Sequence, residues 1–336
     1  MPKDRKAVRF SMGGTMSFSS FQQVADIART LEDLGFSTYY SSDHLMGVGT
    51  APNAETPMME SWTLITALAA VTTRLRLGVL VTGVTYRHPS MLAKIAVTLD
   101  IVSNGRLDIG IGGAWSKGEH DAFGIAFPAL KERQERLGEA VEILDGLLSK
   151  PRFSYSGKYY RLQDAPFAPG PVQKPRPPIL LAAVGDSGVD LAAKYAQTWC
   201  AVATPAYAKE RIGRLEAKAR EAGRDPKEIE CAVYIALHLS DDAAEVRRAL
   251  DASISRITSQ QKRQTFAQAR NSMPSDSLEM RARAGALIGS GGQIVEQIHQ
   301  YVAAGVTHII VMTPRPFDRR LAEKFRKEVM TPFVGN

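Results

Sequence analysis

An aspartate and a histidine, Asp43 and His44, directly follow a predicted short strand over residues 37–42. An imidazole gains or loses a proton near neutral pH, and a neighbouring carboxylate can hold its orientation or bind a cofactor. A helix-capping aspartate beside a surface histidine would give the same Asp-His pair, so the residues alone leave both interpretations open. We take Asp43 and His44 as the candidate catalytic residues.

Other titratable groups near predicted strand ends carry weaker signals. Arg87 and His88 precede a proline, where they could meet an anion or form only a turn. Glu119 and His120 are expected to face solvent or the rim of the fold. Glu60 stands just before a predicted helix, where its charge would complement the helix dipole.

Three glycines, Gly110, Gly112 and Gly113, lie within four positions at the end of a predicted strand over residues 107–111. Because glycine has no Cβ, a flat ring could lie directly on this backbone, and Trp115 could form a wall of the space. A tight turn without a ligand would use the same glycines. The glycines are stronger evidence for a ligand site because the neighbouring strand, over residues 75–81, also ends irregularly.

A second binding signal is a glycine turn after the strand predicted over residues 179–183. Val184 and Gly185 come between that strand and a predicted helix. Backbone N–H groups at the start of a helix bind anions, which makes this the best phosphate site in the chain. A tight turn alone would look much the same.

Several kinds of chemistry lack their usual motif. The sequence contains no His-x-His, no His-Glu-x-x-His and no Gly-x-Ser-x-Gly, so a barrel metallohydrolase and a serine nucleophile are disfavoured and no metal is expected. Cys200 and Cys231 form neither a redox pair nor a zinc motif. An organic cofactor is therefore the expected source of chemistry.

Composition places the chain among ordinary globular enzymes. Its 336 residues are 44% hydrophobic and 23% charged, with a net charge of +7. The basic residues are interleaved with acidic ones, which disfavours nucleic acid as a partner and favours attraction of a small anionic cofactor. No apolar run is long enough to cross a bilayer and residues 1–9 do not read as a signal peptide, so we expect a cytoplasmic protein without a membrane partner.

Strands and helices alternate along the whole chain. The predicted strands cover residues 8–12, 37–42, 75–81, 107–111, 179–183, 198–201, 231–239 and 308–312. Eight such strands predict a (β/α)8 TIM barrel. A doubly wound open sheet is the alternative, but no Gly-x-Gly-x-x-Gly follows the first strand. Ser19 or Ser20 is expected to cap the first helix and Ser90 the helix that ends at Asn104.

We expect a single domain over residues 1–336 with three inserted segments. They lie near residues 113–131, 150–178 and 242–290. The second should contain a β-hairpin around Ser156 and Gly157, because aromatic and polar residues alternate there. The third is expected to be helical and polar.

Four stretches of this pattern resemble the bacterial luciferase-like superfamily: residues 42–44, 77–89, 103–115 and 178–185. The chain looks most like the branch that uses the deazaflavin coenzyme F420. The resemblance implies an oxidoreductase that exchanges a hydride between the deazaflavin and a small organic substrate. The alternative within the same superfamily is an FMN-dependent monooxygenase, which activates oxygen.

The resemblance also implies a site. It places the ring over the ends of the third and fourth strands, near Asp43, Val81, Thr82, Gly112 and Gly113. It implies a cis peptide bond between Leu80 and Val81, and it places the cofactor phosphate at Val184 and Gly185. His44 would stand near the carbon that exchanges hydride and would donate or accept the proton.

Two positions depart from the pattern of the sugar-phosphate dehydrogenases in this superfamily. Those enzymes have a tryptophan four residues after the histidine and a glutamate after the glycines of the fourth strand. Val48 and Trp115 stand at these places. Neither their substrate nor their acid is therefore assigned to this chain. Barrels of this kind often pair through apolar helix faces, so we expect a homodimer.

Overall fold

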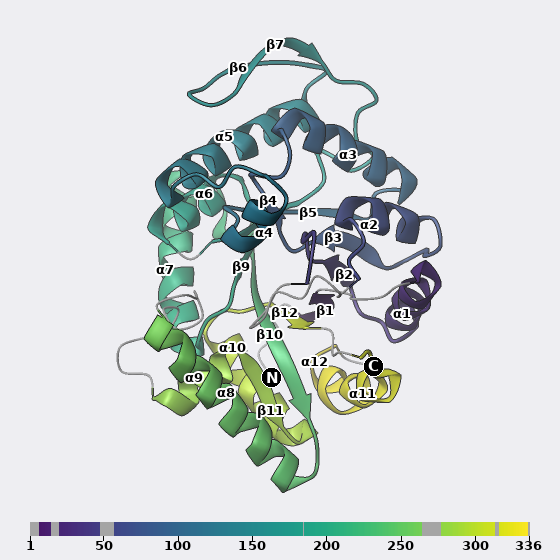
Figure 1. Cartoon of the computed structure of the whole chain (residues 1–336), viewed down its shortest axis with the longest axis vertical. Helices are drawn as coiled ribbons and strands as arrows, with labels where there is room; N and C mark the ends of the chain where they lie inside the picture. The colour runs from purple at the N-terminus through teal and green to yellow at the C-terminus, as the bar shows by residue number, and fades with distance from the viewer. Residues whose placement is uncertain are drawn as a thin grey trace.

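Eight parallel strands close into a barrel surrounded by helices (Figure 1). The computed structural model describes residues 7–14, 20–47, 57–183, 185–263, 277–312 and 316–334. Around the barrel the strands are β1 (Arg9–Gly14), β2 (Thr38–Ser41), β3 (Arg76–Val79), β5 (Leu107–Gly112), β8 (Ile179–Ala182), β9 (Thr198–Ala201), β10 (Glu230–Leu239) and β12 (His308–Met312). β12 pairs with both β10 and β1, which closes the circle. The predicted (β/α)8 barrel is confirmed.

Helices lie outside the barrel and bury one face of every strand. They are α1 (Phe21–Asp33), α2 (Ser61–Ala69), α3 (Pro89–Val102), α5 (Leu130–Ser149), α6 (Asp186–Tyr195), α7 (Pro205–Glu221), α10 (Gly291–Ala303) and α11 (Arg319–Phe325). A short 3-10 turn (Pro226–Glu228), a π turn (Arg326–Met330) and α12 (Thr331–Val334) complete this layer. Side chains alternate along a strand, so Ile109 and Ile111 pack against helices while Asp108 and Gly110 face the interior.

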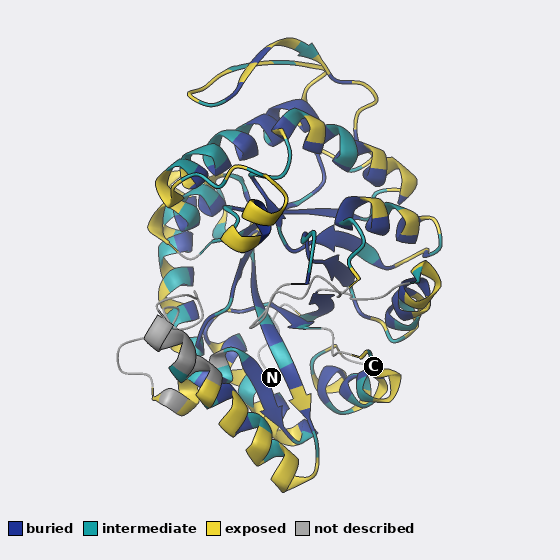
Figure 2. Ribbon diagram, in the orientation of Figure 1, coloured by how far each residue is buried: buried dark blue, intermediate teal, exposed yellow. Residues whose placement is uncertain are grey.

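The inserted segments carry their own elements. The expected hairpin is present as β6 (Arg152–Ser156) and β7 (Arg161–Pro166), and it projects beyond α5 with mostly exposed residues (Figures 1 and 2). The segment after β5 contains the short helix α4 (Lys117–Ala122).

The third inserted segment differs from its prediction. It contains α8 (Ala243–Arg263) and α9 (Leu278–Ala284), but also a strand, β11 (Ala286–Gly289), which pairs parallel with β10. The strand was missed because its residues directly follow α9 and were assigned to the predicted helical segment. Its Ala286 and Ile288 pack with Leu250 and Ala282 in a small separate core.

The start of α3 also differs from prediction. His88, not Ser90, caps the helix, and its ring accepts a hydrogen bond from the Ser90 backbone N–H at 3.3 Å. Pro89 occupies the first helical position, where its fixed φ and missing N–H are tolerated, so the cap moves forward. Ser20 does occupy the N-cap of α1, but without a side-chain hydrogen bond.

The third predicted strand is interrupted near its end. β3 stops at Val79, the peptide bond between Leu80 and Val81 is cis, and pairing with β5 resumes at β4 (Thr82–Gly83). The cis bond implied by the superfamily resemblance is therefore confirmed.

Charged side chains close the amino-terminal end of the barrel. Arg9 donates two hydrogen bonds to Glu230, at 3.1 and 2.9 Å, across 221 residues of chain. His308 Nδ1 lies 2.9 Å from the same carboxylate. Asp108 accepts from Arg76 Nε at 3.0 Å. No sequence signal predicted this network, which lies at the barrel end where residues stabilise the fold rather than bind ligands.

The network lowers the pKa of Glu230 in the folded chain. Burial opposes its ionisation, but the charges and hydrogen bonds of His308 and Arg9 outweigh burial and lower the pKa of Glu230 to about 2, from 4.5. A carboxylate with a lowered folded-state pKa stabilises the fold above its unfolded pKa, and this stability is lost as the pH falls through the folded pKa. The contribution is therefore complete near pH 7 and declines between about pH 4.5 and 2.

Glu230→Gln should lower the free energy of unfolding by roughly 3 kcal/mol at pH 7, because Arg9 loses its counter-charge and His308 loses its carboxylate partner. Urea unfolding of the full chain at pH 7 and pH 3 measures the effect, and the difference from the parent should fall to about half or less at pH 3. Glu216→Gln, at an exposed helix pair with Arg220, is the control and should stay within about 0.5 kcal/mol. A destabilisation independent of pH would contradict the electrostatic explanation.

Candidate active site

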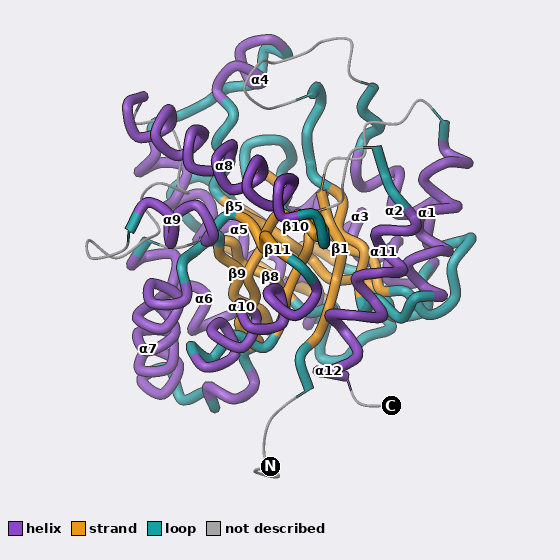
Figure 3. Tube along the Cα trace, turned by 90° about the horizontal axis from the view of Figure 1, so that it is seen from below, coloured by secondary structure: helices purple, strands orange, loops and turns teal. Residues whose placement is uncertain are grey.

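The residues singled out by the sequence lie at the carboxyl ends of four neighbouring strands. β2, β3, β5 and β8 are adjacent in the barrel, and α4 lies beyond this end (Figure 3). Small molecules bind at this end of parallel barrels. The backbone thus brings these separate sequence positions to one end of the barrel.

Asp43 is buried and forms a two-pronged ion pair with Arg87. The guanidinium donates to the two carboxylate oxygens at 2.6 and 3.0 Å, and its Nη2 also pairs with Glu60. Glu60 in turn caps α2 by accepting from the backbone N–H of Thr63 at 2.7 Å. Burial raises the pKa of Asp43, and the pairing with Arg87 only partly offsets that rise. Arg87, considered as an anion ligand from the sequence, is instead held between two carboxylates.

His44 contacts a carboxylate that the sequence did not assign to it. Glu119 Oε2 lies 2.9 Å from His44 Nδ1 and accepts from the Tyr86 hydroxyl at 2.7 Å, while Glu119 Oε1 accepts from the Leu45 backbone N–H. The side chain of Glu119 is fully buried at the mouth of the barrel, so the expectation that it faces solvent was wrong. The error arises because α4 has only six residues, too few for a periodic apolar face to show which side turns inward.

Glu119 is ionised at neutral pH. Burial disfavours its charge, but hydrogen bonds from His44 and Tyr86 and from the Leu45 backbone outweigh burial and lower the pKa of Glu119 to about 2. His44 therefore lies directly against a negative charge, at the end of β2 where the sequence predicted chemistry.

His120 is fully buried as well, again contrary to the predicted exposure. Its Nδ1 lies 2.7 Å from the carbonyl oxygen of Ser116, its Nε2 lies 2.6 Å from the Thr85 hydroxyl, and its ring stacks on Tyr86 at 4.8 Å. Both ring nitrogens are used inside the protein. His120 thus fastens α4 to the end of β4 and has no nitrogen left for a ligand.

The strand residues predicted to line the site take different positions. Leu80 belongs to a small apolar cluster inside the barrel, and Val81 packs against that cluster. The Thr82 hydroxyl is buried and accepts a hydrogen bond from Trp62 Nε1 at 2.7 Å. Leu80 and Thr82 are therefore buried by other protein groups.

The three glycines of β5 have unequal surroundings. A Cβ added to Gly110 would lie 1.8 Å from the carbonyl oxygen of Val79, and one added to Gly112 would lie 2.8 Å from Val81 Cγ2. A Cβ at Gly113 would meet nothing within 4 Å. Close strand packing therefore requires the first two glycines, and open space lies only beside the third.

Trp115 lies next to His44. The indole and imidazole rings meet edge to face with centroids 5.5 Å apart, and Trp115 is 51% exposed. A half-exposed indole beside a candidate catalytic histidine could form an apolar wall of a ligand site, and that role stays a prediction.

At the end of β8, Gly185 is the N-cap of α6, while Val184 lies outside the described residues. A Cβ at Gly185 would meet nothing within 4 Å. Asp186 in the first turn pairs with Arg211 at 2.7 Å and with Arg214 at 3.2 Å, so its negative charge is countered by two cations from α7. Arg211 also pairs with Glu210 and Arg214 with Asp190, so the charges at this helix start are balanced and its distinguishing feature is the open space at Gly185.

In the part of the chain that the structure describes, no three His, Cys, Asp or Glu side chains gather as a metal site. Over the same residues, no helix has the length and apolar content needed to span a membrane. The titratable groups at the barrel mouth are instead arranged in pairs, Asp43 with Arg87 and His44 with Glu119.

The sequence profile of the luciferase-like monooxygenases matches residues 7–308. The chain belongs to this family. The family consists of oxidoreductases and monooxygenases that use a flavin-like cofactor, and its members act on small molecules.

Relatives in this family include both cofactor types. The chain is 27% identical over 320 residues to an F420-dependent glucose-6-phosphate dehydrogenase of Microbacterium testaceum, covering 92% of each protein. It is 29% identical over 239 residues to the pyrimidine monooxygenase RutA of Yersinia enterocolitica, covering 68% of this chain and 62% of that protein. A solved F420-dependent secondary alcohol dehydrogenase shares the fold, with a TM-score of 0.78, 19% identity, and coverage of 98% of this chain and 100% of that one.

Gly110→Ala should destabilise the fold by about 3 kcal/mol or more, because the new methyl group overlaps the backbone of β3. Gly113→Ala, three residues away, should change stability by less than about 0.5 kcal/mol, since its Cβ enters open space. Thermal unfolding of the two variants under identical conditions makes the comparison. Equal destabilisation by both would show that the space beside Gly113 is not open.

Proposed function

We propose that this protein is a coenzyme F420-dependent oxidoreductase that acts on a small organic substrate. The observation that carries the proposal is His44, held at 2.9 Å from the buried carboxylate of Glu119 and in edge-to-face contact with the half-exposed Trp115. When bound, the deazaflavin supplies a carbon that gives or takes a hydride. His44 takes or gives the accompanying proton, since an imidazole titrates near neutral pH.

The proposed ring site lies at the ends of β2, β4 and β5. Gly113 presents bare backbone to the ring, while Trp115 forms one wall of the site. Val81, with Leu80 and Thr82 packed beside it and Gly112 behind it, forms the opposite wall. Asp43 is fixed by Arg87 and offers a buried, oriented carboxylate to the cofactor.

The proposed phosphate site is the start of α6. Val184 and Gly185 precede the helix, and no side chain at Gly185 obstructs an approaching anion. Helix starts attract anions through free N–H groups and the helix dipole. Arg211 and Arg214 pair with Asp186 in the first turn, which offsets the repulsion between that carboxylate and an anion.

The second candidate is an FMN-dependent monooxygenase, which the similarity to the pyrimidine monooxygenase RutA favours. Both candidates need a flat ring at the same strand ends. They differ in the reacting partner, which is oxygen for the monooxygenase and an organic hydride donor or acceptor for the dehydrogenase.

Titrating the purified, cofactor-free protein with F420 and with FMN, followed by fluorescence, should show at least about tenfold tighter binding of F420. His44→Ala should keep the F420 affinity within about threefold and lower turnover by about 100-fold with a panel of small alcohols, aldehydes and enones. His299→Ala, which removes an exposed histidine on α10, is the matched control. Tighter FMN binding together with oxygen consumption would replace the first function by the second.

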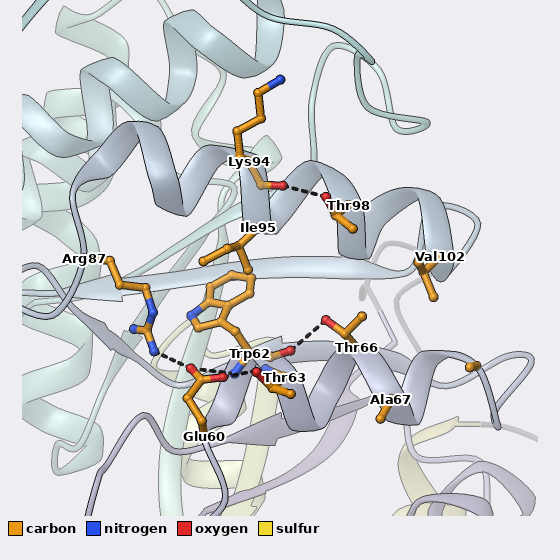
Figure 4. Close-up of a pocket in the computed structure, with 11 residues that line it drawn as sticks. Glu60, Trp62, Thr63, Thr66, Ala67, Arg87, Lys94, Ile95, Thr98 and Val102 are labelled. Carbon is orange, nitrogen blue, oxygen red and sulfur yellow. Dashed lines mark hydrogen bonds and ion pairs between the residues drawn. The ribbon is translucent and has the colours of Figure 1, made fainter.

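We also propose that the chain forms a homodimer through α2 and α3. Figure 4 shows an open groove between these helices, lined by small side chains such as Ala67, Thr66 and Thr98. Met91 and Val102 on α3 are 59% and 45% exposed. One surface thus offers both a groove and projecting apolar side chains, which suits a two-fold contact between identical copies.

Val102→Asp should shift the protein from dimer toward monomer in light scattering coupled to size-exclusion chromatography, because a charge would be buried in the contact. Met280→Asp, on the exposed side of α9, should leave the mass unchanged. The proposal is refuted if the parent protein is a monomer at micromolar concentration. It is also refuted if the Val102→Asp variant remains a dimer.

A further inference from the structure

Glu119 accepts hydrogen bonds from the ends of two strands at once. His44 and the Leu45 backbone N–H follow β2, and Tyr86 follows β4. Both carboxylate oxygens are occupied, and the side chain has no exposure to solvent. An arrangement with three donors on one buried carboxylate fixes its orientation and keeps it charged.

The charge on Glu119 determines which nitrogen of His44 carries the hydrogen. An ionised carboxylate only accepts hydrogen bonds, so the Nδ1 atom at 2.9 Å must be the donor. In neutral His44 the lone pair is then on Nε2. Among the described residues none forms a hydrogen bond with Nε2, and the side chain is 13% exposed.

We propose that Glu119 and Tyr86 are positioning residues that hold His44 in the Nδ1–H form, so that Nε2 is the atom that exchanges the proton with substrate. The proton exchange at Nε2 rests on the proposed oxidoreductase function. The tautomer of His44 follows from the hydrogen bonds alone and does not depend on that function. When bound, the deazaflavin would supply or take up the hydride of a substrate carbon, the accompanying proton would pass between Nε2 and the substrate, and Glu119 would stay ionised throughout. Its charge stabilises the imidazolium that forms.

The other charges around His44 are already paired. Arg87 on the β4 side is balanced by Asp43 and Glu60. His120 on α4 forms hydrogen bonds to a backbone carbonyl and to Thr85 through its two nitrogens. Glu119 is thus the one carboxylate in the described structure that forms a hydrogen bond with the His44 ring, and its replacement should act on that ring directly.

Replacing the two positioning residues should shift the pKa of His44 in opposite directions. Glu119→Gln removes the negative charge and places an amide N–H where His44 Nδ1 now donates, which favours the other tautomer and lowers the pKa of His44. Tyr86→Phe removes one donor from Glu119 Oε2 but keeps the ring that stacks on His120. The carboxylate then interacts more strongly with His44, so the pKa of His44 should rise.

The experiment is NMR of the full chain labelled with 15N-histidine, without cofactor, over pH 5 to 9. His44→Ala identifies the His44 signals among the six histidines. The parent protein should show Nδ1 protonated in neutral His44. Glu119→Gln should lower the midpoint by at least about one pH unit and move the hydrogen to Nε2, whereas Tyr86→Phe should raise the midpoint and keep the tautomer.

Turnover with F420 is the second measurement. Glu119→Gln should lower kcat by about 100-fold and leave the affinity for F420 within about threefold, since the ring position is kept and only the proton transfer is impaired. Asp121→Asn removes an exposed carboxylate from the same short helix, where it pairs with Lys117, and should change neither the NMR midpoint nor kcat.

The proposal is overturned if neutral His44 carries its hydrogen on Nε2 in the parent protein. It is also overturned if Glu119→Gln and Tyr86→Phe shift the midpoint in the same direction, as a general loosening of the fold would do. If Glu119→Gln does not fold, the tautomer of the parent and the sign of the shift in Tyr86→Phe still decide. A protein with no F420 activity but the expected NMR results would refute the proposed function and leave the structural pairing intact.

Discussion

The close contact between β3 and β5 is the constraint on which the site depends. The carbonyl oxygen of Val79 occupies the space that a side chain at position 110 would need, so Gly110 allows the two strands to lie together. Because β3 ends against β5 at this point, the chain leaves the barrel with Thr82 and Gly83 still paired to β5. The next residues, 84–88, then pass over the barrel mouth and deliver Tyr86 and Arg87 to the carboxylates of two other segments.

The two ends of the barrel use similar side chains for different purposes. At the amino-terminal end of the barrel, Arg9 and His308 lower the pKa of Glu230, and this network contributes to folding stability. At the mouth, the pKa of Glu119 is lowered in the same way, but its partner His44 retains a ring nitrogen without a bond to any described residue. A buried carboxylate thus stabilises the fold at one end and, under the proposed function, orients the histidine that exchanges a proton at the other.

The sequence predicts the elements that have a clear period and fails for those that do not. All eight barrel strands were located because each is an apolar run between helices of regular pattern, and Asp43 and His44 followed from their place at a strand end. Glu119 was missed because nothing in a six-residue helix shows which face is buried. The pairing of Arg9 with Glu230 spans 221 residues, and no local pattern carries such information.

The glycines of β5 show that one sequence pattern can have two physical causes, close strand packing and open space for a ligand. Their number marked the strand end as unusual, yet Gly110 and Gly112 are required by packing against Val79 and Val81, and only Gly113 adjoins open space. A sequence records that a side chain is excluded but not whether protein or ligand excludes it. Of the two candidate functions, the one with a hydride acceptor or donor needs a proton partner beside the ring. His44, held by a buried carboxylate at the same end of the barrel as Gly113, is the residue that we propose for this role.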